Sequence, residues 1–292
     1  MANLKEVRTR IASVSSTQQI TSAMKMVSAA KFRRAQNSIL GMRPYASQLN
    51  AIIGDIGTDD GVLTPYHEVR AAEKVLLVVV TSNKGLCGAF NSNVIKEASA
   101  RLQHFKDAGS KSVRMITIGK RGSEFFAKQA GLVAASYDDL LDNPSFDAIA
   151  EVCEGIMKSF CNKEYDRVEL VYNQFKNSLT QILSTEQFLP VGGGEQKKES
   201  GEHKMHNDYI FEPDKETILR EMIPLTLRSQ FYRVILDSLA AEHGARMTAM
   251  QKATDNATEL LKDLRLSYNK ARQAAITNEI IEIVSGSEAL KG

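Results

Sequence analysis

The stretch ARMTAMQKATDNATELLKDLRLSYNKARQAA (Ala245–Ala275) decides the fold that we predict for this chain. It contains neither glycine nor proline, and small or apolar residues recur in it at alternating steps of three and four. These positions are Met247, Met250, Thr254, Ala257, Leu261, Leu264, Tyr268, Ala271 and Ala275. A repeat held this long is typical of the seam of a left-handed coiled coil. Because alanine, threonine and methionine bury less apolar area than leucine and isoleucine, we expect the coil to need support from outside.

The first segment of the chain supplies the partner for this seam. The same spacing joins Leu4, Val7, Ile11 and Val14, passes through Gln18 and Thr21, and is expected to resume at Met24 and Val27. We therefore predict an intramolecular antiparallel coiled coil of the two ends around an inserted domain. The expected boundaries are 1–56 for the N-terminal helix, 57–212 for the inserted domain and 213–292 for the C-terminal helix, which should run uninterrupted over Leu225–Ser285 after Pro224.

The inserted domain alternates strand and helix patterns. Strands are predicted at Val75–Val80, Val113–Ile118 and Arg167–Tyr172, with a further candidate at Leu179–Phe188; helices are predicted at Ser92–Lys106, Ser123–Ala130 and Phe146–Asn162. This order predicts a Rossmann-like α/β domain with a largely parallel sheet and helices on its faces. The Gly-rich, charged stretch Val191–Asp208 is expected to be an exposed, mobile loop.

Charge and composition limit the function classes. Residues 1–56 carry a net charge of +6, residues 57–212 carry −4, and residues 213–292 carry zero, so a basic helix is attached to a mildly acidic domain. The longest apolar run, Val75–Val80, is far shorter than the roughly 20 residues that span a bilayer, so membrane association is expected only through a partner. Three cysteines suit a reducing compartment better than a disulfide framework.

The turn NKGLCGAFN (Asn83–Asn91) follows a strand, as phosphate-binding loops do. It has only Gly85 and Gly88 of the three glycines that a dinucleotide fingerprint needs, and Lys84 precedes the glycines instead of following them. We expect a tight strand-to-helix turn that binds no nucleotide, with Asn91 or Ser92 capping the helix.

Other sites also lack support in the sequence. His203 and His206 lie three apart in the expected loop without a convincing third ligand, so neither a metal nor a cofactor is predicted. Apart from Phe32 and Tyr45, the basic first helix lacks the aromatic residues that accompany nucleic-acid binding, which favours a protein partner. No self-sufficient catalytic site is visible. A coiled-coil tether or scaffold and a nucleotide-cofactor enzyme using the α/β domain remain alternatives.

Four stretches together resemble one family. TQQITSAMKMVSAAKFRRAQ (Thr17–Gln36), NKGLCGAFN, YIFEPD (Tyr209–Asp214) and Ala245–Leu290 resemble the γ subunit of F-type ATP synthases, bacterial type, over the full length and in the same order. Ser287 departs from the family, which more often has alanine there. The chain lacks the paired-cysteine insertion of chloroplast members, so no thiol switch is expected. Since the motif begins almost at the first residue, we expect a bacterial protein without an organellar presequence.

The resemblance implies a central rotor-stalk subunit without catalytic residues. It would sit as one copy in a ring of three α and three β subunits, with the ε subunit and the membrane c ring as further partners. Its rotation would couple ion flow to ATP synthesis or hydrolysis at the β subunits. The implied location is the cytoplasmic face of the bacterial plasma membrane, reached through the complex.

The resemblance also implies site residues, position by position. Contacts with the catch loop and lever of β are expected from Met24, Lys25, Arg246, Arg272, Gln273, Thr277 and Glu279; an apolar bearing tip from Ile280, Ile281, Ile283 and Val284; and contacts of the foot with the c ring from Tyr209, Phe211 and Glu212. Without the resemblance, Arg272 would be interpreted as a solvated residue on a coil flank and Met24 as part of the seam.

Overall fold

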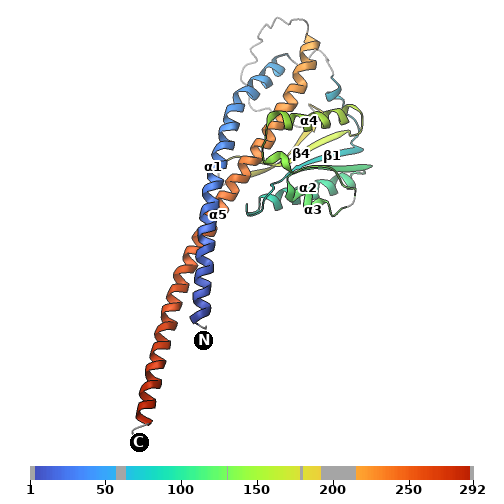
Figure 1. Ribbon diagram of the computed structural model, residues 1–292. Helices are drawn as coiled ribbons and strands as arrows, with labels where there is room; N and C mark the ends of the chain where they lie inside the picture. Colours follow the sequence, from blue (N-terminus) through green and yellow to red (C-terminus); the bar gives the residue numbers. More distant parts are fainter. Residues whose placement is uncertain (1–3, 57–63, 130, 178–179, 192–214, 290–292) are drawn as a thin grey trace. The chain divides into compact units, whose positions relative to one another are not determined.

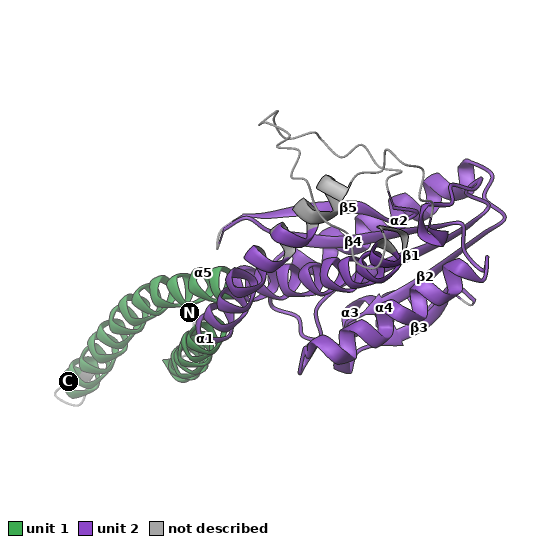
Figure 2. Cartoon of the chain, turned by 90° about the horizontal axis from the view of Figure 1, so that it is seen from above, with its two compact units in different colours: residues 1–28, 247–292 green, residues 29–246 purple. Residues whose placement is uncertain are grey.

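The computed structural model describes residues 4–56, 64–129, 131–177, 180–191 and 215–289. The chain divides into two compact units, one built from the two ends of the chain and the other from the continuous stretch between them (Figure 2). The coil unit comprises Met1–Ser28 and Met247–Gly292, and the sheet unit comprises Ala29–Arg246. Apart from Val191, the loop predicted at Val191–Asp208 lies outside the described residues.

Two long helices, α1 (Leu4–Ile56) and α5 (Lys215–Ala289), contribute to both units. The sequence predicts the C-terminal helix within 213–292, with its uninterrupted part after Pro224; α5 begins at Lys215 and also continues through that proline. A proline removes one backbone hydrogen bond, and the burial of Ile223 and Leu227 beside it offsets that loss. None of the helices in the described segments is both long and apolar enough to cross a membrane.

In the coil unit, hydrogen bonds between side chains of α1 and α5 confirm the antiparallel pairing. The residue number on one helix falls as that on the other rises, which only antiparallel helices produce. The bonds join Arg8 to Tyr268 (2.8 Å), Gln18 to Thr258 (2.7 Å), Thr21 to Thr254 (2.9 Å) and Lys25 to Gln251 (2.6 Å).

The seam predicted on α5 is confirmed as far as Ala271, with Met250, Ala257 and Leu261 buried, but it is wrong at its last position, because Ala275 is exposed. On α1 the prediction is wrong at one position: Val27 is 58% exposed, whereas Ser28 is only 3% exposed. The predicted path takes three successive steps of three residues from Gln18 to Val27, and it therefore drifts off a seam that alternates steps of three and four. The correct continuation from Thr21 runs through Lys25 to Ser28, where a small side chain permits close approach of the helices.

The sheet unit contains one five-stranded sheet in the order β3-β2-β1-β4-β5. Its elements are η1 (Pro65–His67), β1 (Lys74–Val80), α2 (Phe90–Asp107), β2 (Ser112–Ile118), α3 (Lys120–Phe126), β3 (Val133–Tyr137), η2 (Asp139–Leu141), α4 (Phe146–Cys161), β4 (Arg167–Phe175) and β5 (Gln181–Leu189). The first four strands are parallel and β5 pairs antiparallel with β4, which confirms a largely parallel sheet. The sequence prediction missed β3, a short edge strand that lacks a continuous apolar run.

Helices cover both faces of this sheet (Figure 1). Leu76, Val78 and Val80 face a core formed with α4 and α5, whereas the intervening residues of β1 face α2 and α3. Because both faces are buried, β1 is apolar at nearly every position instead of alternating. The buried side chains Leu227, Phe231 and Val234 make α5 part of this core, which extends along the helix to Leu239.

Candidate functional site

The end of α5 is exposed beyond the coil seam. Every residue from Arg272 to Glu288 is exposed, including the expected contact residues Arg272, Gln273, Thr277 and Glu279. The Thr277 hydroxyl donates to the backbone carbonyl of Gln273 at 2.9 Å. Within the described part of the chain, the side chains of Arg272 and Gln273 have no hydrogen bond or ion pair, so their donors and acceptors face outward.

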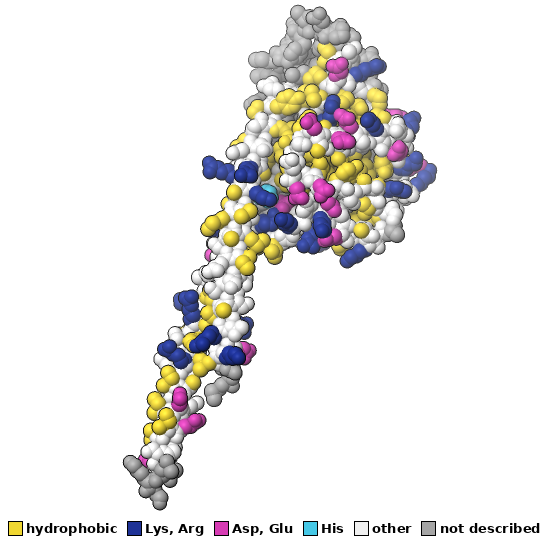
Figure 3. Space-filling view, in the orientation of Figure 1, with side chains coloured by type: hydrophobic (Ala, Val, Ile, Leu, Met, Phe, Trp, Pro, Cys, Tyr) yellow, Lys and Arg dark blue, Asp and Glu magenta, His cyan; other side chains and the backbone are white. Residues whose placement is uncertain are grey.

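The same helix end carries apolar side chains that nothing in the described chain covers. Ile280, Ile281, Ile283 and Val284 are between 54% and 66% exposed. Figure 3 shows hydrophobic side chains along this end of α5, interspersed with charged ones. Soluble surfaces rarely expose apolar side chains in such a group without a partner that binds there.

The other expected contact residues are placed differently. Met24 and Lys25 are half-buried in the coil unit, where the ammonium of Lys25 donates to the Gln251 side-chain carbonyl at 2.6 Å. Their role as contacts of β stays a prediction. The three residues expected at the foot, Tyr209, Phe211 and Glu212, lie outside the described residues.

Arg246, also expected to contact β, is buried in the sheet unit. One guanidinium nitrogen donates to the Glu242 carboxylate. The other donates to the backbone carbonyl of Lys84 at 2.7 Å and lies 3.4 Å from that of Gly85. Its contacts in the structure are therefore with its own chain, and a contact with β stays a prediction.

Burial controls the protonation of the groups around Arg246. Burial raises the pKa of Glu242, although the neighbouring Arg246 opposes the shift. Burial, with the charges of Arg246 and Lys31, lowers the pKa of His243 to about 4. The buried Nδ1 of His243 has no hydrogen-bond partner, so this imidazole is neutral at pH 7.

The turn between β1 and α2 is held by its own side chains. The Ser82 backbone N–H donates to Asn91 Oδ1 at 2.9 Å, and the Ser82 hydroxyl donates to the Lys84 carbonyl at 2.7 Å. Leu86 has a positive φ of 64°, which is uncommon for a residue with a branched side chain. The expectation that Asn91 or Ser92 caps the helix is wrong, because α2 already begins at Phe90 and Asn91 ties the turn together instead.

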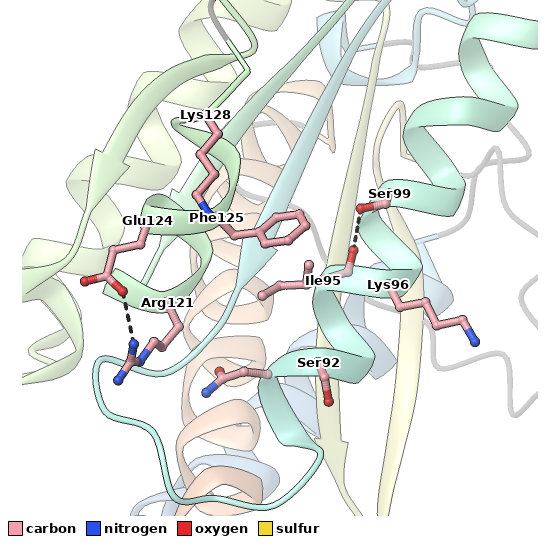
Figure 4. A pocket seen from close by; sticks show the side chains of 9 residues that line it. Ser92, Ile95, Lys96, Ser99, Arg121, Glu124, Phe125 and Lys128 are labelled. Carbon is pink, nitrogen blue, oxygen red and sulfur yellow. Dashed lines mark hydrogen bonds and ion pairs between the residues drawn. The ribbon is translucent and has the colours of Figure 1, made fainter.

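An open groove lies on the surface of the sheet unit (Figure 4). It has a volume of about 720 Å³ and lies between α2 and α3, with Ile95 and Phe125 along it and the Arg121–Glu124 ion pair (3.2 Å) at one end. No motif in the sequence marks this groove, so it could not be predicted from the sequence alone. In the described segments no group of three or more histidine, cysteine, aspartate or glutamate residues is placed to hold a metal ion.

The comparisons with known proteins agree on one family. A model of the family described as ATP synthase matches residues 3–290. The ATP synthase gamma chain of Flavobacterium johnsoniae is 52% identical over 297 residues and is covered in full, as is this chain. That of Cytophaga hutchinsonii is 52% identical over 295 residues, which cover 99% of each chain. The chain belongs to the ATP synthase gamma chain family.

Solved structures show the fold of this gamma chain at lower sequence similarity. A chain in the rotor of Euglena gracilis mitochondrial ATP synthase matches with a TM-score of 0.64 at 20% identity, covering 94% of this chain and 98% of that one. A chain in the central stalk and c ring of the Tetrahymena thermophila enzyme matches with a TM-score of 0.60 at 24% identity, covering 80% and 99%. These matches confirm that the sheet with long terminal helices is the fold of such chains.

Proposed function

We propose that this gamma chain is the central rotor-stalk subunit of an F-type ATP synthase and performs no catalysis itself. Family membership over the whole length supports the role. The observation that carries it is the end of α5, which leaves the coil seam at Ala271 and then exposes polar and apolar side chains that have no partner in the described chain. Such an end is built to be enclosed by other subunits.

The proposed mechanism depends on contacts between the shaft and the surrounding subunits that change with the angle of rotation. A shaft changes the affinity of a surrounding site only if its contacts differ from one angle to the next. Arg272 and Gln273 lie next to one another on α5, so each points in a different direction and can bond to only one neighbouring subunit at a time. Turning the helix would pass these donors from one β subunit to the next, and each β subunit would change its affinity for nucleotide in sequence.

The proposed partners are three α and three β subunits, the ε subunit and the membrane c ring, with one gamma chain per complex. Met24, Lys25, Arg246, Thr277 and Glu279 are further candidates for contacts with β. The apolar residues at the end of α5 would turn inside a sleeve formed by the ring. The complex would place the chain at the cytoplasmic face of a bacterial plasma membrane.

The test is the double substitution Arg272→Glu with Gln273→Ala in the complex reconstituted into vesicles. The exposed side chains make no bonds within the described chain, so unfolding free energy should change by no more than about 0.5 kcal/mol. Loss of a charged hydrogen bond to β should lower ATP hydrolysis and ATP-driven ion uptake at least about fivefold. Both rates are measured on the same vesicles.

A matched control is Lys270→Glu, which reverses a charge on the same exposed helix. Lys270 lies two residues before Arg272 and therefore about 200° around the helix, so its substitution should leave both rates nearly unchanged. Unchanged hydrolysis and ion uptake in the double variant would remove Arg272 and Gln273 from the contact with β. Equal losses in both variants would show a general effect of charge.

Two other measurements separate the alternatives. The mass of the native complex should correspond to one gamma chain for every three αβ pairs, whereas a tether or scaffold need not keep that ratio. Equilibrium dialysis of the isolated chain tests the nucleotide-cofactor enzyme, which micromolar nucleotide binding would support.

A further inference from the structure

The sheet unit has the topology of proteins that bind ligands at one defined crevice. In open α/β sheets this crevice lies at the carboxyl ends of the strands, where the strand order reverses. Here the order reverses between β1 and β4, and the turn that follows β1 (residues 81–89) lies at that point. The crevice is occupied by the protein's own helix α5, because Ala241 and Ala245 pack in one cluster with Cys87 and Phe90 of the turn region.

Arg246 adds directional bonds to this apolar contact. It reaches the turn from α5 and donates to the carbonyl of Lys84, while the Glu242 carboxylate, one helical turn before it, balances its charge. A buried guanidinium requires both a counter-charge and acceptors. The structure supplies both, so Glu242, Arg246 and the carbonyls of Lys84 and Gly85 form one connected group, which we name the clasp.

The turn bound by the clasp is itself held by several hydrogen bonds. The carbonyl of Lys84 accepts from Arg246 and from the Ser82 hydroxyl, both at 2.7 Å. Ser82 is bonded in turn to Asn91 in the first turn of α2. A displacement of α5 along the turn would therefore break several bonds at once and transmit force to both β1 and α2.

We propose that Arg246 and Glu242 are positioning residues, whose clasp locks the α/β sheet to α5 so that the two turn together under torque. The proposal rests on the rotor function proposed above and extends it. Apolar contacts such as those of Ala241 and Ala245 are non-directional and allow a helix to slide or roll. Hydrogen bonds weaken steeply when their angles change, so the clasp resists the motions that the apolar cluster permits.

Hydrogen exchange in the isolated full chain tests the clasp without any partner subunit. The amides of Ser82 and Phe90 report on the turn, since each donates a hydrogen bond within it. In Arg246→Ala, the exchange rate of these amides should rise about tenfold. In Arg246→Lys, which keeps a positive charge and hydrogen-bond donors on a shorter side chain, the rate should rise less. The matched control is Arg228→Ala, which removes an arginine of α5 that bonds Glu154 of α4 at 3.0 Å and should leave the turn amides unchanged.

The assembled enzyme then tests whether the clasp serves coupling. Ion uptake per ATP hydrolysed should fall at least about twofold in Arg246→Ala and by less in Arg246→Lys, while Arg228→Ala keeps the ratio of the unmodified chain. Unchanged exchange at Ser82 and Phe90, or increased exchange with an unchanged ratio, would overturn the proposal. A direct contact of Arg246 with β would instead alter the ratio and leave exchange in the isolated chain unchanged.

These outcomes are separate from those of the rotor proposal. If the unmodified chain fails to assemble with α and β subunits, the rotor function is wrong, whereas the exchange experiment still measures the clasp. If Arg246→Ala does not fold, Arg246→Lys alone tests the clasp, by the exchange of the Ser82 and Phe90 amides and by the ratio of ion uptake to ATP hydrolysis.

Discussion

Acid should destabilise this chain through His243, whose imidazole is held neutral in the sheet unit. Burial and the charges of Arg246 and Lys31 lower its pKa to about 4, against an ordinary value of about 6.5 in the unfolded chain. The unfolded state therefore binds a proton more readily than the folded state. The resulting stability is fully present above about pH 6.5 and is lost as the pH falls through the folded pKa.

The two pKa values set the size of the effect. Between pH 7.5 and pH 5, protonation of the unfolded imidazole should remove about 2 kcal/mol of unfolding free energy, and the loss should approach about 3 kcal/mol near pH 4. Glu242, with Oε1 4.0 Å from His243 Nδ1, opposes part of this change, because a raised carboxyl pKa makes protonation favour the folded state. Other carboxylates titrate in the same range, so only a comparison with a variant isolates the histidine.

The assay is urea unfolding of the full chain, followed by circular dichroism at 222 nm because the chain has no tryptophan. The unmodified chain and His243→Gln are compared at pH 7.5 and pH 5. The variant keeps Glu242 and all other carboxylates, and its loss of stability on acidification should be smaller by about 2 kcal/mol. A difference below about 0.5 kcal/mol would show that the imidazole titrates normally and that its buried position does not govern stability.

Two further predictions concern the fold. Gly119 has a φ of 102°, and a Cβ there would lie 2.4 Å from the carbonyl oxygen of Thr81, the residue after β1. Gly119→Ala should therefore lower the unfolding free energy by roughly 2–4 kcal/mol. Gly109→Ala, at a φ of 83° with open space around the Cβ, should cost only about 1 kcal/mol, and equal losses in urea unfolding would contradict the steric argument. Gln18→Cys with Thr258→Cys replaces a side-chain pair joined at 2.7 Å, so an added thiol oxidant should cross-link the two within one chain. Cross-links found only between chains by mass spectrometry would contradict the antiparallel register.

Local patterns in the sequence predicted the helices and strands whose buried side chains follow a regular spacing along the chain. The apolar run Val75–Val80 predicted β1, since a strand covered on both faces needs apolar residues throughout. The alternating steps through Met250, Ala257 and Leu261 predicted the seam on α5 for the same reason. At Ser28 the seam position is polar, so a prediction based on hydrophobicity placed the seam at the neighbouring Val27 instead.

Sequence patterns could not predict contacts that form only in the folded chain. The carbonyl that Arg246 binds lies 162 residues away in the sequence, and nothing about an arginine followed by a coil motif indicates a backbone acceptor. The neutral state of His243 likewise depends on burial by elements distant in the sequence. The motif match at Arg246 predicted a contact with another subunit, whereas its bonds in the structure are within the chain.

The end of α5 shows why this fold implies a surrounding protein. Ile280, Ile281, Ile283 and Val284 lie within about 160° of one another around the helix, so they form one apolar face, and each is more than half exposed. Fully burying such a side chain gains about 1.5–3 kcal/mol, so covering the exposed parts of all four would gain roughly 4 kcal/mol. The coil seam cannot provide that cover, because its last half-buried position is Ala271. A close-fitting apolar sleeve around α5 would recover this energy at every angle of rotation, because non-directional contacts do not favour one angle over another. The directional hydrogen bonds of Arg272 and Gln273, in contrast, would favour particular angles.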